Sequence, residues 1–170
     1  MKDNQKNFLH DIIAEILELP KNKIIWAYQN NMPRQQPPYV ILRLWGAKAE
    51  AQEEIRSTED SAVKNVYVSQ NVILEVQYFA GTKCNIDPSH ELQILLRELE
   101  TPPVVERFFA ARLAVYDSEN IQDLTDLTDG QTYEYRAMVE LRVRYGSEIK
   151  TNLGAIEEVS GTIEYLSEGE

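Results

Sequence analysis

The chain carries few side chains of the kinds that hold metal ions or act as nucleophiles. His10 and His90 are its only histidines, and Cys84 is its only cysteine. Neither histidine stands in a metal-ligand spacing such as CxxC or HExxH. Cys84 precedes an expected helix start, a position that can activate a thiol, but no suitable His–Asn or His–Asp pairing accompanies it. We therefore expect no catalytic residue, no bound metal and no cofactor.

Carboxylates are densest between residues 117 and 129. They are Asp117, Glu119, Asp123, Asp126 and Asp129. A calcium-binding loop that began at Asp117 would need glycine at its sixth position and glutamate at its twelfth, and those positions hold Gln122 and Thr128. Turn capping and solvation explain these acids. A metal-dependent hydrolase that uses the 117–129 region remains an alternative, although nothing in the sequence selects a pair of acids.

Residues 133–145 alternate between large or apolar side chains and charged ones. The first set is Tyr133, Tyr135, Ala137, Val139, Leu141, Val143 and Tyr145, and Met138 is the one exception in the polar set. This period of two predicts a strand with one buried face. Such a strand would span roughly 40 Å. Its outer face carries charges of both signs, and we expect that face to be available to another protein.

The composition favours one globular domain, residues 1–170. The chain is 43% hydrophobic and 26% charged, with a net charge of −11. Because phosphate binding depends on Lys and Arg, so acidic a chain is a poor candidate for gripping nucleic acid or an anionic membrane. The first residues lack the basic start and apolar run of a signal peptide, so we expect a cytosolic, soluble protein.

The remaining elements predict an α+β fold: a mainly antiparallel sheet with two principal helices packed on one face. The expected helices cover residues 4–19, capped by Asp3 or Asn4 and ended by Pro20, and a segment opened by Asp87 and Pro88 with a leucine stripe. The expected strands cover residues 24–28, 39–45, 66–79, 112–116 and 162–166, and residues 104–110 a helical turn. Residues 29–38 and 117–130 are expected connections. The acidic segment 47–63 is either a solvated loop or an extended arm that orders against a neighbouring subunit.

Some charged residues are candidates for contact with another subunit or partner, because arginine is enriched at interfaces and occurs here on strand faces or in a proline-bearing loop. With two acids of the 47–63 segment they are Arg34, Arg43, Glu53, Glu54, Arg136, Arg142 and Arg144. Strand aromatics such as Trp26 and Trp45 are read first as core residues, with protein contact as the competing interpretation.

The most distinctive string is residues 25–40, IWAYQNNMPRQQPPYV. A tryptophan strand, a polar Pro-Arg loop and Pro-Pro-Tyr entering a strand resemble the neck or tail terminator proteins of tailed bacteriophages. Three further features agree: the preceding helix, residues 121–124 with their internal Asp-Leu pair, and Arg136-Ala137 in the following strand. Segment 47–63 departs most from this pattern.

The resemblance implies a small tail-terminator or tail-completion fold without enzymatic activity. Such proteins usually form a hexameric ring that caps the tail tube, and the sheath where there is one, and joins it to the head–tail connector. DNA passes through the lumen without specific binding. The implied location is the virion neck, after assembly in the bacterial host cytoplasm. A monomeric adaptor that binds another protein is a further alternative.

Overall fold

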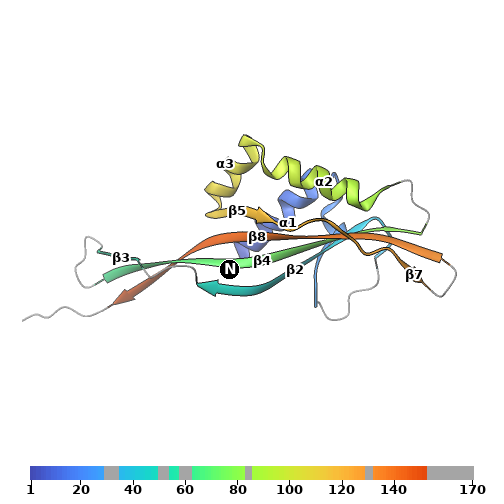
Figure 1. Cartoon of the computed structure of the whole chain (residues 1–170). Coiled ribbons are helices and arrows are strands. Elements are labelled where there is room, and N and C mark those ends of the chain that lie inside the picture. Colours follow the sequence, from blue (N-terminus) through green and yellow to red (C-terminus); the bar gives the residue numbers. More distant parts are fainter. Residues whose placement is uncertain (29–34, 50–53, 58–62, 83–85, 129–131, 153–170) are drawn as a thin grey trace, which may run out of the picture.

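A computed structural model describes residues 1–28, 35–49, 54–57, 63–82, 86–128 and 132–152. A layer of helices covers one face of a long, twisted sheet (Figure 1). The helices are α1 (Asp3–Ile16), α2 (Pro88–Leu99) and α3 (Pro102–Ala110), with a 3-10 turn η1 at Lys21–Lys23. The strands are β1 (Ile24–Trp26), β2 (Tyr39–Ala49), β3 (Glu54–Ser57), β4 (Val63–Gly81), β5 (Leu113–Ser118), β6 (Gln122–Asp123), β7 (Asp126–Thr128) and β8 (Thr132–Asn152). The α+β class is confirmed.

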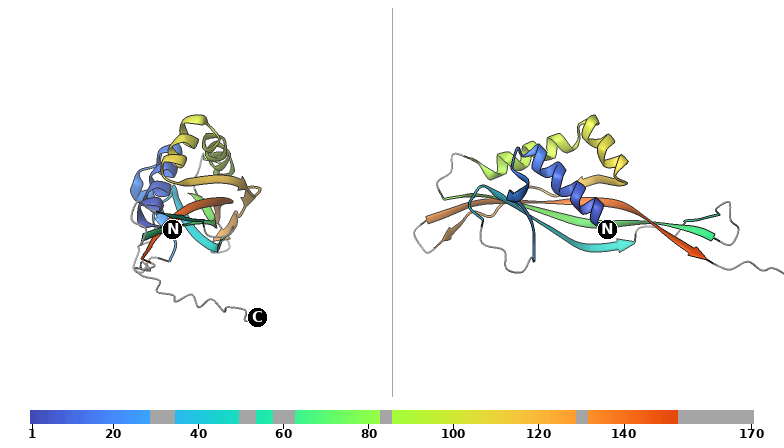
Figure 2. Two further views of the ribbon diagram at one scale, coloured as in Figure 1. Left: turned by 90° about the vertical axis from the view of Figure 1, so that its left-hand side faces the viewer. Right: turned by 180° about the vertical axis from the view of Figure 1, so that it is seen from behind.

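The sheet has the strand order β1-β2-β4-β8-β5. β1 and β2 are parallel, and the other neighbours in this order are antiparallel. β3 pairs with β4, and β6 and β7 pair with β8. β4 and β8 pair from Val63↔Asn152 to Gly81↔Tyr135. The end of this pair that lies beside β3 extends well past the helical layer (Figures 1 and 2).

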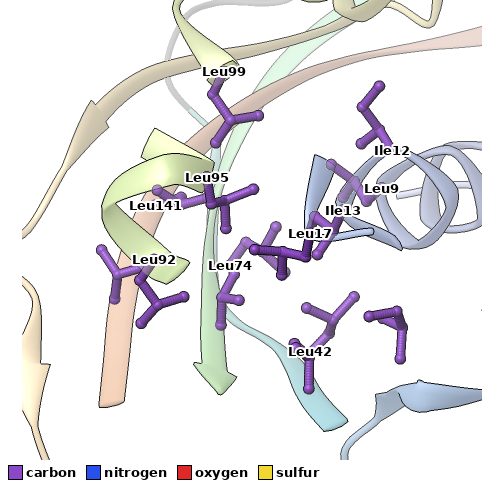
Figure 3. Packing of buried hydrophobic residues seen from close by; sticks show 14 of the residues in the cluster. Leu9, Ile12, Ile13, Leu17, Leu42, Leu74, Leu92, Leu95, Leu99 and Leu141 are labelled. Carbon is purple, nitrogen blue, oxygen red and sulfur yellow. The ribbon is translucent and has the colours of Figure 1, made fainter. Parts of the chain in front are cut away.

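The core forms where the helices meet alternate residues of the sheet. Leu92, Leu95 and Leu99 of α2 are buried, as are Leu74 of β4 and Leu141 of β8 (Figure 3). The alternation predicted for β8 is confirmed from Ala137 to Tyr145, whose apolar members are all buried. Tyr133 and Tyr135 are wrongly placed by that pattern, because they are 54% and 41% exposed. Their end of β8 pairs with β7 beyond α2, where no helix lies above it (Figure 1).

The helix boundaries follow local capping chemistry. Asp87 caps α2 as predicted, since its carboxylate accepts a hydrogen bond from Ser89 N, and Pro88 occupies the first turn. α1 differs from the prediction: its N-cap is Lys2, and it ends at Ile16, before Pro20. The predicted turn at residues 104–110 is a full helix, α3. Prolines occupy its first positions, and the amide hydrogens that proline lacks are ones that the first turn of a helix leaves without a partner in the helix.

Strand structure extends into segments that the sequence predicted as connections. β2 continues to Ala49, and β3 lies inside the 47–63 segment, paired antiparallel with β4. β6 and β7 lie inside the acidic 117–130 connection. The strand predicted at residues 162–166 lies outside the described residues. No helix in the described part of the chain is long and apolar enough to cross a membrane.

The chain that enters β2 packs closely on the end of β4. Gly81 has a φ of +86°, and a Cβ placed on it would lie 2.7 Å from the Cβ of Pro37. Glycine is therefore required here both for its backbone conformation and for space. Beside it, the rings of Tyr39 and Phe79 stack with centroids 4.6 Å apart. These contacts bury both aromatic rings on the sheet face that the helices leave open.

Candidate subunit interface

The sheet face opposite the helices carries most of the charged residues singled out in the sequence. Cross-strand register arranges its side chains in rows that run from β2 through β4 to β8. The rows are Tyr39–Phe79–Arg136, Ile41–Gln77–Met138, Arg43–Glu75–Glu140 and Trp45–Ile73–Arg142. None of the described helices lies on this face (Figure 1). We call it the open face.

Arg43 forms the centre of a hydrogen-bonded network on the open face. Its Nη2 donates to the carboxylate of Glu75, which is only 3% exposed, and its Nη1 donates to Tyr28 Oη at 3.3 Å. Gln77 Nε2 donates to the other Glu75 oxygen at 2.7 Å. The hydrogen bonds to Tyr28 and to Glu75 raise the pKa of Arg43 above its usual value. A buried carboxylate is thus held by one arginine whose own side chain is 36% exposed.

Arg142 and Arg144 reach from β8 to the neighbouring strand β5. Arg142 Nε lies 3.1 Å from Asp117 Oδ2, and its Nη2 donates to Glu119 Oε1 at 3.0 Å. The hydrogen bond to Glu119 is the main cause that raises the pKa of Arg142. The guanidinium of Arg144 lies 5.0 Å from the ring centroid of Tyr116. Both arginines contact side chains of their own subunit while their outer parts stay exposed.

Arg136 holds the 121–125 segment against β8. Its Nε donates to the carbonyl oxygen of Leu124 at 2.7 Å, and Leu124 N donates to the carbonyl of Arg136 at 2.9 Å. The Asp-Leu motif noted in the sequence is therefore fixed by the Arg-Ala pair of the next strand. The Arg136 side chain therefore stabilises the fold of its own subunit.

The structure brings four predicted interface residues to one face: Arg43, Arg136, Arg142 and Arg144. Arg34 and Glu53 lie outside the described residues. Glu54 lies in β3, but its side chain is outside the described part. An interface role for any of these residues stays a prediction.

The acidic cluster forms local turn contacts. Asp123 Oδ1 accepts a hydrogen bond from Thr125 N at 2.9 Å, and hydrogen bonds from the Thr125 side chain and backbone lower the pKa of Asp123. Asp126 Oδ1 accepts from Leu127 N at 2.8 Å. Within the described ranges, no three His, Cys, Asp or Glu residues gather in a way that could hold a metal ion. Asp129 and Cys84 lie outside those ranges.

Of the two histidines, His10 connects α1 to the first strand. Its Nε2 lies 3.0 Å from the carbonyl oxygen of Ile24, and its Nδ1 lies 3.0 Å from Asp11 Oδ1. His90 is exposed in the first turn of α2.

Sequence reasoning missed the partners of the arginines. Glu75 is the one acid in the expected strand at residues 66–79, whose other residues are apolar or neutral. A single acid in such a strand is a sequence signal that predicts a buried carboxylate with a partner. Tyr28, Asp117 and Glu119 carry no comparable signal, because only the fold brings them to Arg43 and Arg142.

The structure is thus that of an α+β protein with a long sheet. The charged residues on its open face bind groups of neighbouring strands, and their side chains face away from the helices. The profile of the phage neck terminator protein family matches residues 6–169, and the chain belongs to this family. Membership gives it a structural tail-terminator role and a place in the virion.

Among solved structures, the chain is similar to the sheath/tube terminator of an extracellular contractile injection system (PVC) in its extended state, with 11% identity and a TM-score of 0.45. That similarity covers 96% of this chain but only 64% of the other one. No curated protein matches the chain.

Proposed function

We propose that the chain is a single domain, residues 1–170, that assembles into a ring, hexameric in the family pattern, at the head–tail junction of a phage. The ring caps the tail tube, and the sheath if the tail is contractile, and joins the tube to the head–tail connector. The protein acts by binding and catalyses no reaction. Assembly takes place in the cytoplasm of the bacterial host.

The observation that carries this proposal is the family match over nearly the whole chain, residues 6–169. The geometry supports it in two ways. First, the described helices and the central strands share one hydrophobic core, as a single assembling subunit requires. Second, the β3–β4–β8 end of the sheet extends past that core and offers strand backbone to a neighbour (Figure 2). Segment 47–63, which contains β3, is the extended arm of this proposal.

The charge of the chain suits a ring through which DNA moves. The net charge is −11, so a lumen lined by average surface of this protein repels phosphate. Each Lys or Arg contact to a phosphate would slow the passage of DNA, because such contacts provide most of non-specific DNA affinity. A strongly basic lumen in the assembled ring would contradict this part of the proposal.

The test uses tail tubes that were assembled without a terminator. Purified wild-type protein is added, and the tube ends are imaged by electron microscopy. We expect a ring at one end of each tube, and a class average gives the copy number. Tubes whose ends stay bare at saturating protein would refute the proposed function.

Two alternatives predict different results. A hydrolase that uses residues 117–129 predicts a large, specific rise in melting temperature with Mg²⁺, Mn²⁺ or Ca²⁺. The carboxylates of Asp117 and Glu119 are already engaged by Arg142, which opposes that reading. A monomeric adaptor predicts a single-subunit mass both in solution and on the tube.

A further inference from the structure

A hollow of about 330 Å³ opens at one edge of the sheet, where β1 stops. Its lining includes Lys6 of α1, Tyr28, which follows β1, and Leu44 of β2. β1 pairs with β2 only as far as Leu42, whose carbonyl then accepts a hydrogen bond from Ala27 N at 2.8 Å. The next part of the β2 edge therefore borders the hollow instead of a strand.

Leu44 presents strand backbone to this hollow. Backbone groups alternate sides along a strand, so the N–H and C=O of Leu44 point to the same edge as those of Leu42. In the part of the chain that the structure describes, no strand lies beside Leu44 there. A bulge between Trp45 and Lys48, with Gly46 at a φ of +67°, ends the regular edge. The edge therefore has room for one short strand.

The charge of the hollow comes from Lys6. Arg43 also lines the hollow, but its charge is balanced by the Glu75 carboxylate. Within the described ranges, the side chain of Lys6 has no ion pair and no hydrogen bond. A carboxylate that enters the hollow on the side of α1 would therefore meet a cation that is not yet paired.

Two exposed aromatic rings lie on the other side of the same edge. Tyr28 is 85% exposed and Trp45 is 43% exposed. Arg43 connects them on the open face, since its Nη1 donates to Tyr28 Oη at 3.3 Å and its guanidinium lies 5.9 Å from the centroid of the Trp45 ring. Strand backbone, a cation on one side and aromatic rings on the other suit an extended peptide in which an acid alternates with apolar residues.

One stretch of this chain has the matching chemistry. Residues 153–170 follow β8, lie outside the described residues, and contain five Glu and no Lys or Arg. Within them, residues 162–166 are Thr-Ile-Glu-Tyr-Leu, the alternating segment that the sequence predicts as a strand. In a strand placed beside Leu44, Glu164 lies on one face and its two apolar neighbours lie on the other.

The end of β8 is far from this edge of its own subunit. Leu44 is level with Leu141, and β8 runs eleven residues beyond Leu141 to Asn152. The end of β8 is thus about 36 Å along the sheet and about 14 Å across it from the place beside Leu44, roughly 39 Å in all.

The chain's own tail is too short to cover that distance. β8 runs away from Leu44, so the tail must first reverse direction, and a β-turn uses about four residues with little advance. Glu164 lies twelve residues after Asn152, and the remaining eight residues span at most about 29 Å. A strand centred on Glu164 therefore reaches the hollow only from another copy.

We propose that residues 162–166 of one copy add a short strand beside Leu44 of the neighbouring copy. Glu164 faces Lys6 across the contact, and the apolar side chains on the other face of the strand cover the exposed aromatic rings. The contact joins two different surfaces, so it repeats from copy to copy. The inference rests on the ring proposed above and specifies a segment that links its subunits.

Photo-cross-linking tests which copy supplies the strand. Tyr165 is replaced by p-benzoylphenylalanine, an aromatic amino acid that bonds covalently to nearby C–H groups under near-ultraviolet light. This probe chain is labelled with ¹⁵N, mixed with ordinary wild-type chain, and irradiated in solution and on tail tubes. Mass spectrometry identifies the joined peptides, and two peptides of different isotope show a link between two chains.

We expect links of different isotope from position 165 to Tyr28, Leu44 or Trp45. Links to these residues only within one chain would overturn the inference, because they assign the strand to its own subunit. Links only to other parts of the surface would overturn it as well, and so would rings in which position 165 stays unlinked.

A charge exchange gives a second, independent readout. Lys6→Glu and Glu164→Lys each place like charges across the contact, so each variant alone should associate about 10-fold more weakly or worse. Both changes in one chain restore opposite charges and should recover most of that loss. Arg97→Glu, on the exposed surface of α2, makes the same change in charge as Lys6→Glu and should leave association unchanged.

Circular dichroism confirms that each variant is folded, and an acid at position 6 suits the N-terminal part of α1. Single variants that assemble like the wild type, or a double variant that shows no recovery, would refute the strand contact. The failure of the proposed function is distinct: there the wild-type copies are cross-linked through this strand in solution, but the ends of the tail tubes stay bare.

Discussion

Replacing Arg43 by methionine tests whether the buried ion pair on the open face stabilises the subunit. The substitution keeps an unbranched side chain but leaves the Glu75 carboxylate, 3% exposed, without its guanidinium partner. Removing one partner of a fully buried pair typically costs about 3–5 kcal/mol. Arg43 is 36% exposed, so water screens part of the interaction, and we expect a loss of about 2–3 kcal/mol.

The assay is urea unfolding at neutral pH, followed by far-ultraviolet circular dichroism. The transition midpoint should fall while its slope stays constant, which identifies a change in stability rather than in compactness. Adding Glu75→Gln to the Arg43→Met chain removes the uncompensated charge and keeps an acceptor for Gln77. We therefore expect the double variant to be more stable than Arg43→Met alone, by about 1 kcal/mol or more.

Arg107→Met is the matched control. Arg107 makes two hydrogen bonds of 2.8 Å to Glu15, but the side chains of both Arg107 and Glu15 are exposed. Solvent-exposed pairs contribute little, so this variant should lose much less stability. A stabilising role for the buried ion pair is refuted if Arg43→Met costs no more than Arg107→Met, or if Glu75→Gln fails to restore stability to the Arg43→Met chain.

Three further results are expected. Leu95→Ala, at a fully buried position of α2, should cost about 2–5 kcal/mol in urea unfolding. Gly81→Ala should destabilise by about 1–3 kcal/mol because of its positive φ and lack of space, whereas Gly146→Ala, with nothing within 4 Å, should stay within about 0.5 kcal/mol. The hydrogen bond from Lys21 lowers the pKa of Asp11, so the stability it contributes is present above the ordinary carboxyl pKa and is lost as pH falls; in Lys21→Met, NMR titration should show the Asp11 pKa rising towards its ordinary value.

The parts of the fold that were predicted correctly are those that local chemistry determines. Asp87 and Pro88 open α2 because a capping carboxylate and a first-turn proline act within a few residues. The buried side of β8 follows from its alternation between Ala137 and Tyr145. The same alternation was wrong at Tyr133, because burial there depends on whether a helix from elsewhere in the chain reaches that end of the strand.

The arrangement of the candidate interface was only partly predictable. Period two places Arg136, Arg142 and Arg144 on one face, and the structure confirms that shared face. Their partners were not predictable, because the register of β5 shifts by a bulge between Val115 and Asp117. That extra residue sets Asp117 opposite Arg142, and no sequence signal marks it.

β3 is a second feature that the sequence did not predict. Segment 47–63 is rich in Glu and poor in apolar residues, which disfavours a strand when local propensity is considered alone. The length of β4 overrides that preference by offering an edge to pair with at Lys64–Tyr67.

The β4–β8 pairing also determines the order in which the chain can fold. Within this pairing, Gly81 and Tyr135 are the partners closest in sequence, and Val63 and Asn152 are the partners farthest apart in sequence. The chain must therefore have synthesised α2, α3 and β5 before β8 can reach β4. Until then β4 lacks the strand that pairs with its second edge in the folded protein. Pairings of such wide sequence separation make folding slow and expose strand edges to wrong partners meanwhile. Folding of this subunit therefore finishes only after nearly all of its described part has been translated.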